Sequence, residues 1–174
     1  TRGWSYGASV ADPRTGEIIK GHVSLGSLRI RQDYLIAQGL TKAPFADNGP
    51  GDAAMMDLAL ARIRQLSAHE VGHTLGFQHN FAASSNNRAS VMDYPHPLVS
   101  LKNDVIVFDD AYDTGIGAWD RTTVAYAYSD FTDGTDELTA LDNILKVAHD
   151  QSLRYISDSD ARSSGGAHPY AHLW

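Results

Sequence analysis

The first thirty residues carry the pattern of two strands, and apolar and polar positions alternate in part of the second. Residues 4–10 are mostly aromatic or small, and residues 17–30 contain many β-forming side chains, with Val23 and Leu25 set between polar neighbours. The stretch ADPRTGE between these segments carries Pro and Gly, which favour a turn. The pattern therefore predicts a hairpin of two strands joined by a tight turn.

Helical spacing replaces this alternation between residues 53 and 75, where good helix formers dominate. Asp52 is the expected N-cap, and Gly76 is placed to end the helix because glycine readily adopts the left-handed conformation found beyond a helix C-terminus. The apolar side of this helix is predicted from four residues at helical spacing: Met56, Leu60, Ile63 and Leu66.

Three shorter helical patterns flank the long helix. Residues 31–40 predict a short helix closed by Gly39, residues 120–128 another short helix, and residues 136–150 a longer one. The apolar face of the last is expected from Leu138, Leu141, Ile144, Leu145 and Ala148. Segments rich in Pro, Gly, Ser and Asn separate these patterns and predict loops. A small sheet followed by helices indicates an α+β fold.

Length, charge and composition narrow the class of protein. The chain has 174 residues, which fits one domain with a real core, and its net charge of −7 without a basic run argues against nucleic acid as a partner. No apolar run approaches the roughly 20 residues that a membrane-spanning helix needs. Because the chain has no cysteine, any bound metal must be held by His, Asp or Glu.

The stretch HEVGHTLGFQHN, residues 69–80, concentrates three histidines and one glutamate. His69 and His73 are four residues apart on the predicted helix, so their imidazoles project from nearly the same side and can reach one metal ion. Glu70 points about 100° away around the helix, too far to be a natural ligand, but it can approach a water bound to that metal. This spacing predicts a zinc site with Glu70 as general base.

Gly76 determines where the third histidine lies. A continuing helix would carry His79 away from the metal, whereas a glycine turn brings it back as the third ligand. Three neutral imidazoles leave the fourth zinc position for water, as in catalytic sites. The short motif alone also occurs on surface helices with solvated histidines, but matching five positions is far more specific and favours one zinc ion.

The pattern formed by His69, Glu70, His73, Gly76 and His79 resembles the signature of the metzincin zinc peptidases. In that family a downstream turn places a methionine beneath the zinc ligands, and SVMDY, residues 90–94, resembles it. The resemblance implies this role for Met92. Some metzincins carry a tyrosine two residues later whose hydroxyl can reach the zinc.

The resemblance therefore implies a catalytic role for Tyr94. A phenol O–H aimed at the oxyanion of the reaction would stabilise it, which is an independent chemical argument for that role. The alternative is that Tyr94 only packs beside Pro95.

The resemblance also implies a zincin-like catalytic domain over residues 1–174. Residues 1–76 would form an upper part with the hairpin and active-site helix, and residues 77–174 a lower part with the third ligand, the Met-turn and the C-terminal helices. Only 68 residues precede His69. This is fewer than metzincin catalytic domains usually have, so an incomplete upper part is expected.

A closer similarity is to a poorly characterised group of large bacterial proteins regarded as zinc-dependent metalloproteases. The segments DPRTGEI, HEVGHTLGFQHNF, SVMDYP and AHPYAHLW carry it. It implies that this chain is the catalytic part of a longer protein. It also implies an extracytoplasmic location, either secreted, periplasmic or envelope-associated.

These observations predict a metalloendopeptidase that acts on a peptide or protein, with Glu70 moving a proton from water to the leaving amine. The hairpin is the expected edge along which an extended substrate pairs, although plain sheet structure explains it equally well. Two alternatives stay open. One is a zinc hydrolase of another amide, such as a cell-wall crosslink. The other is a zinc-holding module without turnover, which the presence of Glu70 disfavours.

The remaining candidates are weaker. The acidic run over residues 104–120 invites calcium but lacks the ligand period of an EF-hand loop, so a solvated surface is the favoured interpretation. His96, next to the Met-turn, is a candidate for lining the cleft. Four further histidines, His22, His149, His168 and His172, lack ligand spacing and are expected to be structural or on the surface. No organic cofactor is predicted.

Overall fold

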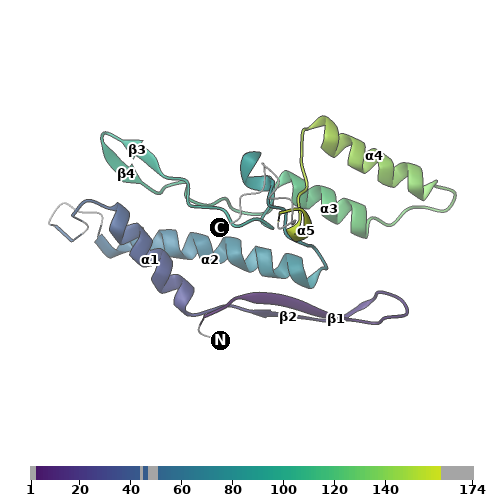
Figure 1. The fold of residues 1–174 in the computed structure, drawn as a ribbon, viewed down its shortest axis with the longest axis horizontal. Helices are drawn as coiled ribbons and strands as arrows, with labels where there is room; N and C mark the ends of the chain where they lie inside the picture. Colours follow the sequence, from purple (N-terminus) through teal and green to yellow (C-terminus); the bar gives the residue numbers. More distant parts are fainter. Residues whose placement is uncertain (1–2, 44, 47–50, 162–174) are drawn as a thin grey trace. The chain divides into compact units, whose positions relative to one another are not determined.

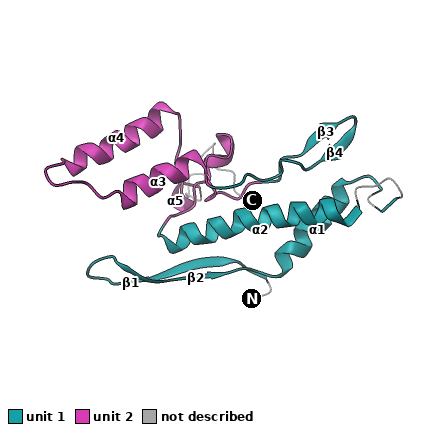
Figure 2. Ribbon diagram, turned by 180° about the vertical axis from the view of Figure 1, so that it is seen from behind, with its two compact units in different colours: residues 1–76, 96–115 teal, residues 77–95, 116–174 magenta. Residues whose placement is uncertain are grey.

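The computed structural model describes residues 3–43, 45–46 and 51–161. The chain divides into two compact units: unit 1 comprises Thr1–Gly76 and His96–Gly115, and unit 2 comprises Phe77–Pro95 and Ile116–Trp174 (Figure 2). Residues 96–115, which the sequence analysis assigned to a lower part, thus group with unit 1. Helices and small two-stranded sheets make up the described residues, which confirms the α+β class.

Unit 1 begins with the predicted hairpin. Strand β1 (Tyr6–Ala11) pairs antiparallel with β2 (Ile18–Ser24), and both run along one helix of the unit (Figure 1). The connecting turn is closed by the N–H of Asp12, which donates to the carbonyl of Glu17 at 2.8 Å, and Gly16 adopts a φ of +76° within it. The hairpin prediction is confirmed for the turn and for both strands.

Helix α1 (Leu28–Leu40) begins earlier than predicted. The second strand was expected to reach residue 30, but it ends at Ser24 because the chain turns at Gly26, whose carbonyl accepts from the N–H of Arg29. Gly39 lies inside this helix and does not close it. The helix ends instead at Thr41, which is extended and whose N–H still donates to the carbonyl of Ala37 at 3.1 Å.

Helix α2 (Gly51–Thr74) is the long helix that the sequence predicted, but Asp52 lies in its first turn and is not the N-cap. Its buried face also differs from the predicted one, because Met56 and Leu60 are 42% and 48% exposed. Leu66 of the predicted face is buried, and so are Met55 and Leu58, which pack with Ala37 of α1 and with Ala111 and Tyr112.

Polar residues explain this difference in the face of α2. Arg62 and Gln65 lie buried on the side that packs into unit 1, so hydrophobicity alone does not mark that side. The guanidinium of Arg62 lies 5.5 Å from the ring centroid of Tyr112. It also faces the buried Asp33 of α1, whose carboxyl has a raised pKa because burial outweighs the charges of Arg29 and Arg62.

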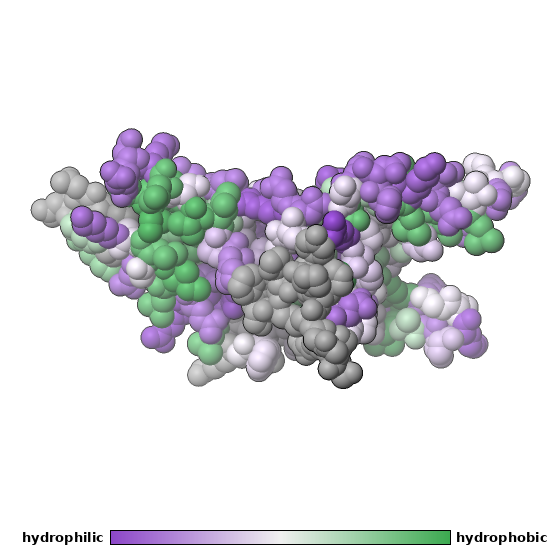
Figure 3. Space-filling view, turned by 45° about the horizontal axis from the view of Figure 1, so that its top comes forward, coloured by the Kyte–Doolittle hydropathy of each residue, from purple (hydrophilic) through white to green (hydrophobic). Residues whose placement is uncertain are grey.

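A second hairpin in unit 1 was not predicted. Strands β3 (Ser100–Lys102) and β4 (Val105–Val107) pair antiparallel across Asn103 and Asp104. Both turn residues have positive φ, +52° and +61°, which matches the two-residue turn that suits the twist of a hairpin. Apolar surface (green) lies exposed beside hydrophilic surface in Figure 3, and Leu101 and Val105 of this hairpin are 75% and 56% exposed.

Unit 2 is mainly helical. It contains a 3-10 turn at Ala83–Ser85, α3 (Ala118–Tyr128), α4 (Glu137–Asp150) and the single-turn helix α5 (Asp158–Ala161). The helices predicted over residues 120–128 and 136–150 are confirmed. On the predicted apolar face of α4, however, only Ala148 is fully buried among the described residues, and Leu138 is 76% exposed.

The core of unit 2 is small. It is formed by Phe81, Ala82, Ile156 and Ala161, with Tyr94 packed against it. This core joins residues that follow the zinc motif to residues near the end of the described chain. The AHPYAHLW segment and the histidines at 168 and 172 lie outside the described residues. No helix of the described part is long and apolar enough to cross a membrane.

Candidate metal centre

The C-terminal turns of α2 present the first two candidate ligands. His69 and Glu70 are buried, at 2% and 4% exposure, and His73 is partly buried. The Nε2 atoms of His69 and His73 lie 3.1 Å apart, with the two rings nearly perpendicular at an interplanar angle of 87°. Two nitrogens bound to tetrahedral zinc at ~2.0–2.1 Å would be separated by about 3.3 Å. The pair therefore already has the spacing of two zinc ligands.

Gly76 ends the helix as the spacing predicted. Its φ is +88°, a value that side chains rarely adopt, and its N–H donates to the carbonyl of His73 at 3.0 Å. Three residues later comes His79. Candidate ligand nitrogens of His69, His73 and His79 all lie within 4.8 Å of one another. An all-imidazole set in a chain without cysteine is a donor set that suits zinc.

The hairpin of unit 1 lies against the same helix turn. A Cβ atom built on Gly7 of β1 would meet the carbonyl oxygen of Glu70 at 1.9 Å and the Cβ of His73 at 3.0 Å. Only glycine fits there, because its lack of a side chain lets β1 approach the backbone of α2. Gly21 of β2 similarly faces Thr74, because a Cβ atom built on Gly21 would lie 3.2 Å from the Cβ of Thr74. The predicted hairpin is therefore seated directly on the turn that carries Glu70 and His73.

In unit 2, both ring nitrogens of His79 have partners. The hydroxyl of Tyr94 lies 2.7 Å from Nε2, and a carboxylate oxygen of Asp158 lies 2.7 Å from Nδ1. The rings of Phe81 and Tyr94 pack around the imidazole, at centroid distances of 5.2 and 4.9 Å. The structure thus places Tyr94 at the nitrogen through which His79 would bind a metal, and it adds Asp158, which the sequence analysis did not single out.

Asn80, which follows the third histidine, is fully buried. Its amide Nδ2 donates to the carbonyl of Arg154 at 2.8 Å, while its Oδ1 accepts from the N–H groups of Ala82 and Ile156 at 3.2 Å each. Its own N–H donates to the carbonyl of Met92 at 2.9 Å. Asn80 therefore ties the third-ligand segment to the predicted Met-turn and to residues 154–156.

Met92 is buried, at 3% exposure, in a segment that a carboxylate organises. Asp120 of α3 accepts hydrogen bonds from the Ser90 hydroxyl, from the N–H of Val91 at 2.8 Å and from the N–H of Gly117 at 2.6 Å. Asp120 is itself only 4% exposed. The expectation of a solvated acidic surface over residues 104–120 is therefore wrong for Asp120, which anchors the methionine segment.

Two further contacts hold this segment close to α3. The N–H of Trp119 donates to the carbonyl of Ala89 at 2.8 Å. A Cβ on Gly117 would meet that same carbonyl oxygen at 2.0 Å, so glycine is required for the approach. On the other side, the buried Asp93 accepts from the N–H of Ser84 at 2.8 Å. The predicted Met-turn is thus fixed at both ends by carboxylates.

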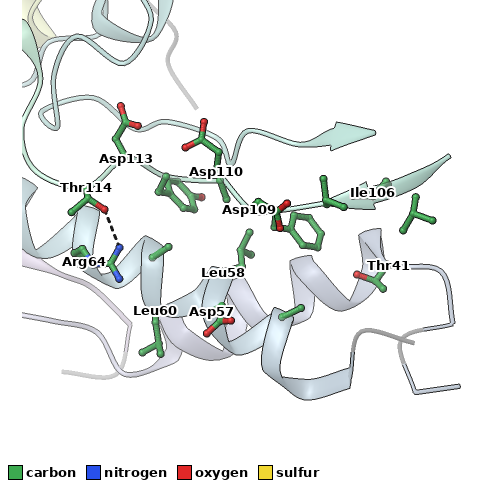
Figure 4. Close-up of a pocket in the computed structure, with 17 residues that line it drawn as sticks. Thr41, Asp57, Leu58, Leu60, Arg64, Ile106, Asp109, Asp110, Asp113 and Thr114 are labelled. Carbon is green, nitrogen blue, oxygen red and sulfur yellow. Dashed lines mark hydrogen bonds between the residues drawn. The ribbon is translucent and has the colours of Figure 1, made fainter. Parts of the chain in front are cut away.

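The remaining acidic residues lie elsewhere. Asp109, Asp110 and Asp113 are exposed and line a cleft of about 840 Å³ beside α2 within unit 1 (Figure 4). In that cleft Arg64 donates to the hydroxyl of Thr114 at 3.4 Å. Among the residues described, the three-histidine group is the one set of potential ligands that converges, so no acidic cluster there has the geometry of a cation site.

His96 is exposed and groups with unit 1, and His22 and His149 are exposed as expected. His22 packs against Tyr6, with the ring centroids 5.8 Å apart, and His149 lies 3.8 Å from the carboxylate of Asp150.

Three residues that support the site were missed from the sequence. Asn80 was quoted within the motif, but nothing in the local pattern shows that it is buried. Asp120 and Asp158 act across 29 to 79 positions of sequence. A single sequence gives no signal that pairs residues at such separations.

A sequence model of one protein family, described as Met-zincin, matches residues 51–174. The matched region begins with α2 and includes all three candidate histidine ligands, Glu70, Met92 and Tyr94. No curated protein and no solved structure matches the chain.

Proposed function

This chain belongs to the Met-zincin family, and we propose that it is a zinc-dependent metalloendopeptidase in which Glu70 is the general base. The single observation that carries this proposal is the convergence of three histidine nitrogens within 4.8 Å. Glu70 follows the first of these histidines, His69, on α2. His69, His73 and His79 would hold one zinc ion. When bound, the zinc supplies Lewis-acid chemistry that polarises a carbonyl and makes water more acidic.

Glu70 supplies the proton transfer. Glu70 is 4% exposed and follows the proposed ligand His69 on α2, so it is shielded from bulk solvent. From this position on the helix it can approach a water bound to the metal. It would accept the proton as water attacks the peptide carbonyl, and donate it to the nitrogen of the leaving amine. The same carboxyl group thus acts first as base and then as acid.

Tyr94 would stabilise the negative charge that develops on the carbonyl oxygen. Its hydroxyl already lies 2.7 Å from Nε2 of His79, the nitrogen available to a metal. If His79 held the zinc through Nε2, the hydroxyl of Tyr94 would no longer donate to that nitrogen and could donate to another acceptor close by. A phenol O–H at that position can donate to the oxyanion of the tetrahedral intermediate.

The hairpin β1–β2 is the proposed surface for an extended substrate. It is seated through Gly7 on the helix turn of Glu70, and an extended peptide can pair with the free edge of such a hairpin by backbone hydrogen bonds. We also propose that the protein is extracytoplasmic, which cell fractionation of the source organism would test.

The metal site is tested by replacing His73 with alanine and measuring bound zinc by elemental analysis. The unaltered chain should bind about one zinc per molecule, and His73→Ala should lose most of it. His149→Ala removes an exposed histidine on α4 and serves as the matched control, with unchanged zinc. Equal zinc in the two variants would show that the assigned ligands are wrong.

The general base is tested by Glu70→Gln, which keeps the shape and removes the basic group. Zinc should stay bound, while turnover of a peptide panel should fall by about 10²–10⁴-fold, the usual contribution of general-base catalysis. A parallel panel of cell-wall muropeptides separates a peptidase from a hydrolase of crosslink amides. Turnover of muropeptides without turnover of peptides would replace the proposed substrate class.

A further inference from the structure

The hydrogen bonds of His79 define which of its nitrogens carries the proton and which carries the lone pair that a metal would bind. A carboxylate can only accept, so the 2.7 Å contact with Asp158 requires the proton on Nδ1 of His79. In the neutral imidazole Nε2 then carries the lone pair, and the hydroxyl of Tyr94, 2.7 Å away, can donate to it. This is the tautomer that ligates zinc through Nε2.

His79 needs such a partner more than the other two histidines. His69 and His73 project from α2, where the helix fixes their backbone and their spacing. His79 lies outside any helix or strand, after the turn at Gly76, so its backbone has no ladder of hydrogen bonds to hold it. The orientation of its ring depends on the groups that contact it.

Asp158 is held in place from both directions along the chain. Upstream, Ile156 donates its N–H to Oδ1 of Asn80 and accepts from the N–H of Phe81 at 2.8 Å. Downstream, the N–H of Ser157 donates to the carboxylate of Asp160 at 3.2 Å, and the N–H of Ala161 returns to the carbonyl of Ser157 at 3.0 Å. Asn80, the residue next to His79, thus fixes the segment from which the carboxylate of Asp158 approaches His79.

We propose that Asp158 is a positioning residue for the metal centre: it fixes the tautomer and the ring orientation of His79, so that Nε2 faces the zinc. This inference rests on the proposed function, because it takes His79 to be a zinc ligand. Carboxylates that accept from the second nitrogen of a histidine ligand also raise the basicity of that histidine. Asp158 does not touch the reacting atoms and acts only through His79.

Exposure sets the expected size of the effect. The side chain of Asp158 is 41% exposed and that of His79 is 18% exposed, so water screens part of their attraction. Removing such a partner typically weakens metal binding or activity by 10–100-fold. For this partly exposed pair we expect the lower end, about 10-fold in the zinc dissociation constant.

The test measures the zinc dissociation constant of the whole chain by competition with a chelator. Asp158→Ala should weaken binding by about 10-fold, and Asp158→Asn by less, because an amide oxygen still accepts from Nδ1–H but carries no charge. Asp142→Asn removes an exposed carboxylate on α4 and should leave zinc affinity unchanged. Circular dichroism of each variant verifies that the helices are retained.

A second readout needs no metal. Nitrogen-15 NMR of the zinc-free chain reports which nitrogen of His79 carries the proton. The wild type should show the Nδ1–H form, and Asp158→Ala should shift the population toward Nε2–H. Zinc affinity of Asp158→Ala within twofold of wild type, together with an unchanged tautomer, would overturn the inference. Absence of zinc binding in the wild type, with the tautomer change still present, would instead refute the proposed function and support the positioning.

Discussion

Replacing Asp120 with alanine should destabilise unit 2 more than any surface substitution, although Asp120 lies outside the zinc motif. Its carboxylate accepts from the Ser90 hydroxyl and from the N–H groups of Val91 and Gly117. Alanine provides no acceptor, so all three donors lose their partner. The segment that carries Met92 then loses its attachment to the start of α3.

The structure sets the magnitude of this loss. A hydrogen bond to a charged group contributes roughly 1.5–3 kcal/mol, so three such bonds give an upper limit of about 4.5–9 kcal/mol. Ser90 and Asp120 are buried, at 5% and 4% exposure, whereas Val91 and Gly117 are partly exposed, so water can replace part of what their N–H groups lose. We therefore expect Asp120→Ala to cost about 3–5 kcal/mol. Domains are stable by only about 5–15 kcal/mol, so this loss is large.

Asp120→Asn provides the graded comparison. Its amide oxygen can still accept from the two backbone N–H groups, while its NH₂ group faces the Ser90 hydroxyl, which can turn to act as acceptor. We expect a cost of about 1–2 kcal/mol from the lost charge and the rearranged hydroxyl. The order wild type, Asp120→Asn, Asp120→Ala is thus part of the prediction.

Urea unfolding measures these differences. Far-UV circular dichroism follows the helices. Tryptophan fluorescence adds a local signal because Trp119 immediately precedes Asp120 and stacks on Tyr155, with centroids 5.3 Å apart. Asp130→Ala is the matched control, because Asp130 is exposed and its loss should change stability by less than about 0.5 kcal/mol. If Asp120→Ala unfolds at the same urea concentration as this control, the anchoring argument is wrong.

Two further substitutions test the packing of the helix turn and the role of the hydroxyl. Gly7→Ala places a Cβ 1.9 Å from the carbonyl oxygen of Glu70, so we expect the free energy of unfolding to fall by about 1–3 kcal/mol and turnover to decrease. Urea unfolding and a peptide assay measure these two effects. Gly39→Ala on α1 is the control, because its Cβ would enter open space, and this substitution should be neutral or slightly stabilising. Tyr94→Phe keeps the packing of the ring and should reduce kcat by about 10²–10³-fold, with little change in KM and with zinc retained. Tyr126→Phe, at an exposed tyrosine, is its control, and equal kcat in these two variants would leave Tyr94 as a packing residue only.

Local signals in the sequence predicted the elements well. Turn residues between two β-forming segments predicted the first hairpin, and the run of helix formers predicted α2 together with its end at Gly76. These features depend on residues within a few positions of one another. The ligand spacing belongs to the same class, because a helix of 3.6 residues per turn fixes the relation of His69 to His73 without help from the rest of the fold.

The buried face of α2 was misjudged for a tertiary reason. The buried side of α2 includes Arg62 and Gln65, which hydrogen-bond to each other along the helix, and Arg62 also faces Asp33 and Tyr112 in the folded unit. Burial of charged residues is rare unless they are paired, so the sequence pattern favoured Met56 and Leu60 instead. No single-sequence pattern reveals which charged residues will meet such partners.

The same distinction separates the two halves of the metal centre. The first two histidines owe their geometry to one helix, so local spacing is sufficient to predict it. The third histidine stands on irregular backbone, and its surroundings come from three distant segments: Met92 and Tyr94, the anchor at Asp120, and Asp158. Asn80 bonds to two of these, through the carbonyls of Met92 and Arg154. A residue that satisfies several backbone groups of separate loops has little freedom to change, because any replacement leaves buried N–H or C=O groups unpaired. The physical requirement at position 80 is therefore a short side chain that both donates and accepts, and asparagine meets it.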